Sequence, residues 1–440
     1  MMTFLRAASV VFLTTLAAKL LIAGAGAAVS NTTDTNIPRI YSHSERTLIH
    51  ATFTEMSVSI VAGVNALTPG SIDGDGSLAT EVTLDYPNWV TLDAKGNIFI
   101  SEAANNRIRK VDKNTGIIST VAGGRGRSAF SGDGGLATLA GISNPFVMIF
   151  DLFGDLFFSD VLNKRIRKIT TSTGIINTVV GTGSTEFNGE DMLGTSASVA
   201  LVAGLACDSE GNLFYTDFEH KRIRKLTRNT GIVKTVAGTG NFAGMGTNFN
   251  NVEALKTNIN PTSMIIDASG NLYFTSNSFG TGFLKLTMTT GIITTVETYD
   301  RVGSLLIDGS GSIYYAKYYG YIGTSPSGSQ VFSLVKIGAG GSFEIITNNL
   351  VEANPTYVDA AGALYAYTRY TVLKFTQNNF ITAPPSRQPT LKSVPPTCPL
   401  VTVTAPPTRQ LTPPPQPRNK PTKCPRGKKP SRKPRSPSPR

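Results

Sequence analysis

Residue types that build most metal and nucleophilic sites are scarce in this chain of 440 residues. It contains three cysteines, three histidines and one tryptophan. Three cysteines are too few for a disulfide scaffold, and His220, alone in a predicted loop, is typical of an exposed polar residue rather than a zinc ligand. The Gly-x-Ser-x-Gly sequence that carries the nucleophile of many hydrolases is absent. The composition therefore predicts no catalytic residue and no cofactor.

Acidic residues are missing from the C-terminal part of the chain. Residues 381–440 hold 13 lysines and arginines, 18 of the 25 prolines and no acidic residue. Residues 1–380 carry 28 basic and 29 acidic groups, so the formal charge of +12 resides in the C-terminal segment. We predict a disordered, basic, proline-rich tail over residues 381–440 that binds acidic polymers in a salt-dependent way. Cys398 and Cys424 within it could pair in an oxidising compartment or link to a partner.

Long apolar runs are missing too, except at the N-terminus. Residues 1–28 combine a basic start, an apolar run and a small-residue end, which is typical of a secretory signal peptide. An uncleaved membrane anchor is the alternative, because residues 7–29 approach the ~20 residues that span a bilayer. Lys19 interrupts the run and favours cleavage. We therefore expect a secreted, extracellular protein in which residues 29–53 form a flexible linker and Asn31 is the glycosylation site.

A unit of nearly constant length recurs between these two ends. Its copies open with an Asp-x-x-Gly sequence at Asp93, Asp151, Asp208, Asp267, Asp308 and Asp359. The first four are 58, 57 and 59 positions apart, and the last two open shorter copies. In each copy, β-branched and aromatic runs alternate with glycine turns, which predicts four short strands. Six such units without helical periodicity predict an all-β fold, a six-bladed β-propeller over residues 54–380.

The first three copies share a distinctive central sequence. It reads GNIFISEAANNRIRKVD, GDLFFSDVLNKRIRKIT and GNLFYTDFEHKRIRKLT, and a stretch SGDGGLAT lies between the first two. On these residues the chain resembles the NHL family, over roughly residues 54–380. The resemblance implies a six-bladed propeller that acts mainly as a binding scaffold, and it says more about fold than about function. Some intracellular members bind RNA through a basic face, but a propeller without net positive charge on a secretory route argues against a specific nucleic-acid partner.

The sixth copy lacks a fourth strand. Residues 355–376 supply only three strands, whereas the sequence SVSIVAG of residues 57–63 matches the fourth strand of the other copies but precedes the first copy. An open ring would leave sheet edges exposed. We therefore predict that the N-terminal strand completes the sixth blade.

Each of the first three copies carries a basic triplet on its third strand. An acidic residue lies across a short loop from the first arginine, which predicts a structural ion pair between cross-strand neighbours. The three predicted pairs are Glu102–Arg107, Asp160–Arg165 and Asp217–Arg222. For the second arginines, structural pairing and binding of an anionic ligand both stay open. These are Arg109, Arg167 and Arg224.

The links between the first copies are long and rich in glycine. They span residues 64–86, 124–144, 182–200 and 239–260. Residues 73–76 and 131–134 invite a calcium interpretation, but each offers only one or two carboxylates where calcium takes 6–8 oxygen ligands. Glycine turns account for them better, and we predict no metal site. Long loops on a rigid scaffold usually carry binding, so we expect the partner on the face where these links emerge.

The fifth copy holds a cluster of tyrosines. Tyr318, Tyr319 and Tyr321 follow its second strand and enter a predicted loop that runs to Val331. Exposed rings with a polar handle suit a partner interface, so we predict that the three anchor a ligand. Burial under the neighbouring loops is the alternative.

Together these features predict a secreted or cell-surface propeller without enzymatic activity. We expect it to bind a protein or glycan through its long-loop face, while the tail tethers it to acidic polymers; a membrane would be involved only if the N-terminal segment stays uncleaved. A hydrolase or lyase acting in the central cavity is the alternative, and it would need acidic residues there. The predicted inner strands WVTL, VMIF, GLAC and SMII are apolar, which argues against such an enzyme.

Overall fold

The computed structural model describes most of the repeat region and two short stretches before it. The described residues are 39–40, 49–50, 56–64, 74–124, 128–244, 247–276, 282–297, 302–322, 329–337, 343–351 and 353–377. No helix among them is long and apolar enough to cross a membrane. The predicted signal peptide, Asn31 and the predicted tail with Cys398 and Cys424 lie outside the described residues. Within the predicted linker, β1 (Arg39–Ile40) and β2 (Ile49–His50) form a short antiparallel pair.

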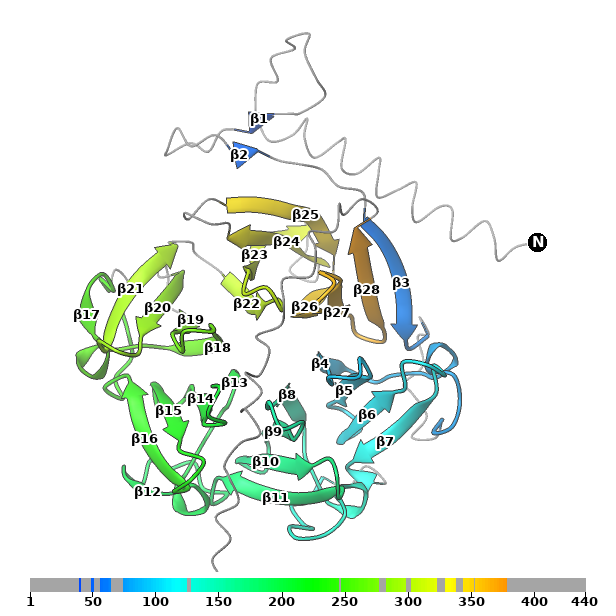
Figure 1. Ribbon diagram of the computed structural model, residues 1–440, viewed down its shortest axis with the longest axis horizontal. Helices are drawn as coiled ribbons and strands as arrows, with labels where there is room; N and C mark the ends of the chain where they lie inside the picture. Colours follow the sequence, from blue (N-terminus) through cyan, green and yellow to red (C-terminus); the bar gives the residue numbers. More distant parts are fainter. Residues whose placement is uncertain are drawn as a thin grey trace, which may run out of the picture. The chain divides into compact units, whose positions relative to one another are not determined.

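Six antiparallel sheets stand in a ring as the blades of a six-bladed β-propeller (Figure 1). Blade 1 holds β4 (Pro87–Leu92), β5 (Ile98–Glu102), β6 (Arg107–Val111) and β7 (Ile118–Ala122). Blade 2 holds β8 (Pro145–Phe150), β9 (Leu156–Asp160), β10 (Arg165–Thr170) and β11 (Ile175–Val180). Blade 3 holds β13 (Leu205–Cys207), β14 (Leu213–Asp217), β15 (Arg222–Leu226) and β16 (Ile232–Ala237). The fold predicted from the repeats is confirmed.

The second half of the ring continues the same order from the inner to the outer strand. Blade 4 holds β18 (Pro261–Ile266), β19 (Leu272–Ser276), β20 (Phe283–Thr287) and β21 (Ile292–Glu297). Blade 5 holds β22 (Val302–Ile307), β23 (Ile313–Ile322), β24 (Ser329–Ile337) and β25 (Phe343–Val351). Blade 6 holds β26 (Asn354–Val358), β27 (Leu364–Tyr367) and β28 (Val372–Gln377), and takes its fourth strand from β3 (Met56–Ala62).

The closure of the ring follows the prediction. Strand β3 pairs antiparallel with β28, with Val58 opposite Phe375 and Ser57 opposite Thr376. The hydroxyls of Ser57 and Thr376 lie 2.6 Å apart. The N-terminal strand therefore completes the last blade, and the two ends of the propeller are held together by a strand pair (Figure 1).

The Asp-x-x-Gly turns join the first and second strands of each blade. In blade 1 the Asp93 carboxylate accepts hydrogen bonds from the backbone N–H groups of Lys95 and Asn97, at 2.9 and 2.8 Å. Gly96 adopts φ of +82°, a conformation that favours glycine. Because the strands are antiparallel, these turns and the Thr-Gly turns share one face of the ring, called the turn face below. The loops between second and third strands lie on the opposite face, called the loop face.

The links leave the outer strands on the loop face, as expected. They then run along the outer edge of the next blade. β12 (Met192–Leu193) pairs with β16 and β17 (Val252–Glu253) pairs with β21, so blades 3 and 4 gain a fifth strand. Single bridges, Leu78 to Ile117 and Leu136 to Ile175, do the same in blades 1 and 2. A 3-10 turn follows in each link, at η1 (Ala79–Glu81), η3 (Ala137–Leu139), η4 (Gly194–Ser196) and η5 (Ala254–Lys256).

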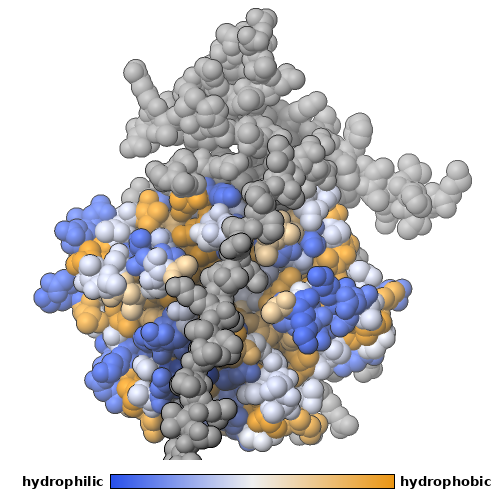
Figure 2. Space-filling model, viewed as in Figure 1, coloured by the Kyte–Doolittle hydropathy of each residue, from blue (hydrophilic) through white to orange (hydrophobic). Residues whose placement is uncertain are grey.

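Apolar side chains fill the spaces between neighbouring blades. Phe99 and Ile108 of blade 1 pack against Phe158 of blade 2, and Phe214 of blade 3 packs in one cluster with Phe274 of blade 4. Burial of a side chain of this size contributes about 1.5–3 kcal/mol. On the outside, hydrophobic and hydrophilic residues are interspersed over the visible blades (Figure 2). The packing therefore fixes each blade against the next and holds the loops of both faces in place.

Candidate functional site

Partly exposed aromatic rings stacked against cationic side chains recur on the loop face. Each ring comes from a link or from the residues just before an inner strand, and each cation from a loop between second and third strands or the start of the third strand. The pairs are Phe130 with Arg165 at 3.6 Å, Phe187 with Arg222 at 4.0 Å, Tyr86 with Arg369 at 4.7 Å, and Phe242 with Lys221 at 6.0 Å. The four rings are 37–62% exposed. We call these eight residues the aromatic–cation row.

Hydrogen bonds to the backbone hold two of the three arginines of the row, Arg165 and Arg222, in place. Arg165 donates to the carbonyls of Asn163 and Thr182, at 2.6 and 2.9 Å. Arg222 donates to the carbonyls of His220 and Thr239, at 2.8 and 3.1 Å. Both guanidinium groups are thus fixed above their rings before any partner binds.

Of the three predicted cross-strand ion pairs, one forms. Arg107 lies 2.7 Å from Glu102, and both side chains are buried. Asp160 is opposite Arg165, and Asp217 opposite Arg222, in the strand register, as predicted. Their side chains nevertheless do not meet.

The two remaining acids are occupied by nearer donors, which is why those predictions are wrong. Asp160 accepts from the Asn163 side chain at 2.9 Å and from the backbone N–H of Ser143 at 2.6 Å, and lies 3.5 Å from Arg167. Its burial raises its pKa, an effect that these hydrogen bonds oppose. Asp217 instead faces His220 at 2.8 Å.

The second arginine of each triplet is buried beneath the link that precedes its blade. In each case the counter-ion is an acidic residue of that link, 34 positions earlier in the chain. The pairs are Arg109–Asp75 at 2.8 Å, Arg167–Asp133 at 2.6 Å and Arg224–Glu190 at 3.3 Å. All three arginines are 0% exposed. They are therefore unable to receive an anionic ligand from solvent, so of the two alternatives left open for them structural pairing holds and the ligand-binding hypothesis is wrong.

The glycine-rich links use their acids for this pairing. Asp75 also accepts from the Thr120 hydroxyl at 3.1 Å, and Asp133 accepts from Arg167. Asp73 lies outside the described residues. Within the described part of the chain, no group of three or more His, Cys, Asp or Glu side chains could hold a metal ion.

His220 fastens the link of residues 182–200 to blade 3. Its Nδ1 lies 2.8 Å from the Asp217 carboxylate and its Nε2 lies 2.7 Å from the Thr185 carbonyl oxygen. Both partners are acceptors, so only the doubly protonated ring donates at both positions. The hydrogen bond to Asp217 is the largest cause of a raised pKa at His220, and burial opposes it. His220, predicted to be an exposed polar residue, thus joins the link to blade 3 by two hydrogen bonds that both form only when its ring is protonated.

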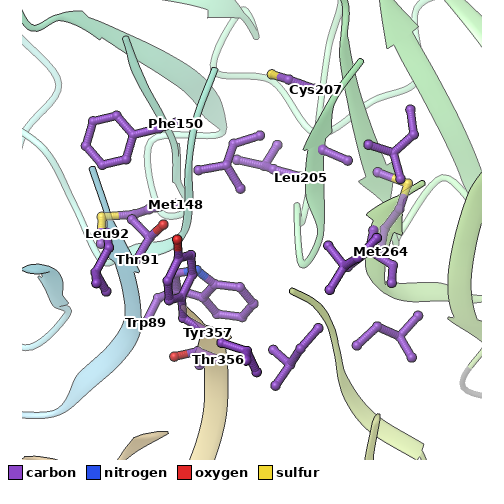
Figure 3. A pocket seen from close by; sticks show the side chains of 18 residues that line it. Trp89, Thr91, Leu92, Met148, Phe150, Leu205, Cys207, Met264, Thr356 and Tyr357 are labelled. Atoms are coloured by element: carbon purple, nitrogen blue, oxygen red, sulfur yellow. The ribbon is translucent and has the colours of Figure 1, made fainter. Parts of the chain in front are cut away.

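A cavity of about 340 Å³ lies between the inner strands of all six blades (Figure 3). Its lining of eighteen residues contains no Asp, Glu, His, Lys or Arg. Cys207 is among them, and burial raises the pKa of its thiol to about 12, so the thiolate needed for nucleophilic attack is not formed at neutral pH. The cavity therefore offers neither the acids nor the nucleophile that a hydrolase would use.

The tyrosine cluster of the fifth copy lies in a strand, not in a loop. β23 continues to Ile322, and Tyr321 is opposite Gln330 of β24. The side chains of Tyr318, Tyr319 and Tyr321 lie outside the described residues, so their role as a ligand anchor stays a prediction.

Comparison with known proteins gives distant matches. No family model matches the chain. Protein SUPPRESSOR OF QUENCHING 1, chloroplastic, of Arabidopsis thaliana is 26% identical over 164 residues, which is 36% of this chain and 15% of that protein. Virginiamycin B lyase from Staphylococcus aureus aligns at 12% identity with a TM-score of 0.43, covering 73% of this chain and 99% of the lyase. An auxiliary nutrient binding protein from Bacteroides ovatus aligns at 12% identity and 0.46, covering 74% and 78%.

The aromatic–cation row was not predicted from the sequence, although a signal for it exists. Phe130 precedes Arg165 by 35 positions, and Phe187 precedes Arg222 by the same number. A search for pairs at a fixed offset across the repeats would have found both. The predicted ion pairs were derived from neighbouring residues within one hairpin. Such neighbours do not reveal the aromatic–cation pairs, because the ring and the cation of each pair are far apart in the sequence.

Proposed function

We propose that this protein is a secreted propeller of the NHL type that binds a partner protein through the aromatic–cation row of its loop face. The row carries the proposal because aromatic and arginine side chains dominate the energetics of protein interfaces. Each ring is covered on one side by a cation and is open to solvent elsewhere. Such rings offer a rigid apolar surface whose ordering on binding costs little side-chain entropy.

An enzymatic role is not favoured by the cavity. Propeller hydrolases need carboxylates that converge on a metal or a substrate. The described residues that line the cavity include none, and Asp160 and Asp217, at the loop-face ends of their strands, are already paired. Binding on the loop face therefore accounts for more of the observed side chains than catalysis in the centre.

A capture experiment with matched variants tests the proposal. The triple variant Phe130→Ala, Phe187→Ala, Phe242→Ala removes three rings of the row. Phe153→Ala is the control, because Phe153 is 55% exposed and stacks under Arg228 at 3.6 Å in the same manner, but on an Asp-x-x-Gly turn of the opposite face. The full chain should capture a protein from the extracellular fraction of its source.

The expected result separates the two faces. Loss of hot-spot rings worth about 2 kcal/mol in total weakens binding about 30-fold, so the triple variant should lose the partner and Phe153→Ala should keep it. Equal capture by all three proteins would overturn the proposal. Retention of a neutral glycan on an array, without capture of any protein, would overturn the choice of a protein partner.

The predicted tail adds a second attachment in this proposal. Thirteen positive charges without acids should hold the full chain on an acidic polysaccharide at low salt and release it as salt screens the charges. A chain ending at Phe380 should not be retained. Changing Tyr318, Tyr319 and Tyr321 together to Ala in the capture assay tests whether these tyrosines extend the loop-face interface.

A further inference from the structure

The central cavity lies at the end of the inner strands that points to the turn face. Its lining includes the last residue of every inner strand, namely Leu92, Phe150, Cys207, Ile266, Ile307 and Val358. The aspartates of the six Asp-x-x-Gly turns follow these residues directly. The cavity is thus separate from the aromatic–cation row, and a ligand bound in it would be independent of the function proposed for that row.

One side of the cavity is polar. β4 of blade 1 contributes Trp89 and Thr91, and the neighbouring inner strand β26 of blade 6 contributes Thr356 and Tyr357 (Figure 3). The indole N–H and the three hydroxyls of these residues make no hydrogen bond to any described residue of the chain. The Oγ1 of Thr356 has no exposed surface, so this hydroxyl does not open into the cavity, whereas the polar groups of Trp89, Thr91 and Tyr357 are not fully buried.

Polar groups without partners are unusual in such a place. A buried donor or acceptor left unsatisfied costs about 1–3 kcal/mol, and most are paired in native proteins. Burial raises the pKa of Tyr357 to about 12, so its hydroxyl stays neutral and able to donate. The indole N–H of Trp89 and the hydroxyls of Thr91 and Tyr357 lie on two adjacent strands, and they offer three hydrogen-bonding groups to a molecule that enters the cavity.

The opposite side of the cavity is aliphatic. β13, β18 and β22 supply Leu205, Ala206, Met264, Ile265, Ile266, Leu305, Leu306 and Ile307 to the lining. In Figure 3, Leu205 and Met264 lie across the cavity from Trp89 and Tyr357. A bound molecule would contact apolar surface on this side and hydrogen-bonding groups on the other.

We propose that the cavity binds a neutral, largely apolar small molecule that carries hydroxyl or carbonyl groups along one edge. The polar edge meets Trp89, Thr91 and Tyr357, and the apolar body meets the aliphatic side. An anion is disfavoured, because the described residues that line the cavity include no lysine or arginine and an aspartate follows the last lining residue of each inner strand. The volume of about 340 Å³ is within the range of ligand pockets, toward its small end.

A solvatochromic probe tests this inference on the full chain. Propionyl-dimethylaminonaphthalene is neutral, apolar and carries one carbonyl acceptor, whereas anilinonaphthalene sulfonate has a similar ring system and a negative charge. The neutral probe should bind one per chain with a blue-shifted emission. The anionic probe should bind at least tenfold more weakly.

Two variants that keep the shape of the cavity make the test specific. Thr91→Val and Tyr357→Phe together remove two hydroxyls, and the neutral probe should then bind about tenfold more weakly, as expected for a loss of about 1.4 kcal/mol. Tyr273→Phe is the matched control, since Tyr273 is absent from the lining and its loss should leave binding unchanged. Thermal melting confirms that all variants fold.

Two results would overturn the inference. The absence of saturable binding of the neutral probe to the wild-type chain would mean that water alone occupies the cavity. Equal affinity of the wild type and the Thr91→Val, Tyr357→Phe variant would mean that the probe binds elsewhere.

Discussion

Blades 3 and 4 fill the same buried position of the third strand differently, blade 3 with a charged side chain and blade 4 with an uncharged one. In blade 3 the fully buried Arg224 meets Glu190 of the link, and Glu190 also accepts from the backbone N–H of Thr235 at 2.9 Å. At the corresponding positions blade 4 has Leu284, also fully buried, and Asn250. The side-chain oxygen of Asn250 accepts from the backbone N–H of Thr295 at 3.1 Å.

The difference separates two tasks of the link residue. Capping the outer strand needs only a side-chain oxygen, and Asn250 performs it without charge. Neutralising a buried arginine needs a carboxylate, because an uncompensated charge in the interior is costly. The acid is therefore present in blades 1 to 3, where an arginine is buried, and absent in blade 4, where leucine replaces it.

Giving blade 4 the arginine of blade 3 should produce the largest effect. Leu284→Arg buries a charge in a cluster with Phe249 and Ile293 and should cost about 4 kcal/mol or more of the free energy of unfolding. Adding Asn250→Glu should recover part of that loss, because it supplies the missing carboxylate. Denaturant unfolding measures both, and a single variant as stable as the wild type would contradict the comparison.

Removing the shared acid of blade 1 should come next in size. Glu102 is fully buried and lies within ion-pair distance of both Arg107 and Arg109. Glu102→Gln leaves two buried arginines with one partly exposed carboxylate, and should cost about 3 kcal/mol of unfolding free energy. Asp75→Asn is the control, since Asp75 is 52% exposed and its loss should cost less than about 1 kcal/mol. Similar losses for the two variants would contradict the importance of burial.

The smallest effect is a pH dependence confined to blade 3. The position of His220 is occupied by Asn163 in blade 2 and by Asn105 in blade 1, neither of which titrates. Since the pKa of His220 is raised in the folded state, its contribution is complete below its unfolded value of about 6.5 and is lost as pH rises through the folded value.

The melting temperature as a function of pH measures this contribution. As pH rises above about 6.5, the melting temperature of the wild type should fall relative to that of His220→Asn. Over the same range, a protease should cleave the link near Thr185 faster in the wild type. The corresponding link of blade 2 should show no such change. Parallel pH profiles of the two proteins would show that the histidine does not fasten the link.

The sequence predicts the propeller well because its repeats are local. The Asp-x-x-Gly turns, the strands and the closure by residues 57–63 each follow from short patterns, and β3 pairs with β28 as predicted. The ion-pair partners of the arginines are less predictable. Strand register placed Asp160 opposite Arg165 correctly, but it could not show that Asn163 and the backbone of Ser143 donate to the Asp160 carboxylate instead. Side-chain choice among several donors depends on distances that register does not specify.

The long links were misjudged for a related reason. Their length indicated loops that carry binding, but their backbone pairs with the outer strands of the following blades and their acids pair with the buried arginines there. The constant separation of 34 positions between acid and arginine could have revealed this, because Asp75, Asp133 and Glu190 obey it and Asn250 keeps it opposite Leu284. A contact between a blade and the link before it can be recognised in the sequence only when the repeats are aligned, because only then is the constant separation visible.

A double-mutant cycle on Arg224 and Glu190 tests most directly whether the link acid exists to neutralise the buried arginine. Glu190→Asn alone leaves Arg224 without a carboxylate within ion-pair distance and should cost about 2 kcal/mol of unfolding free energy, less than a fully buried pair because Glu190 is 38% exposed. Arg224→Leu with Glu190→Asn, which reproduces blade 4, should be close to the wild type, giving a coupling of about 2 kcal/mol or more. Additive losses in the double variant would contradict the account.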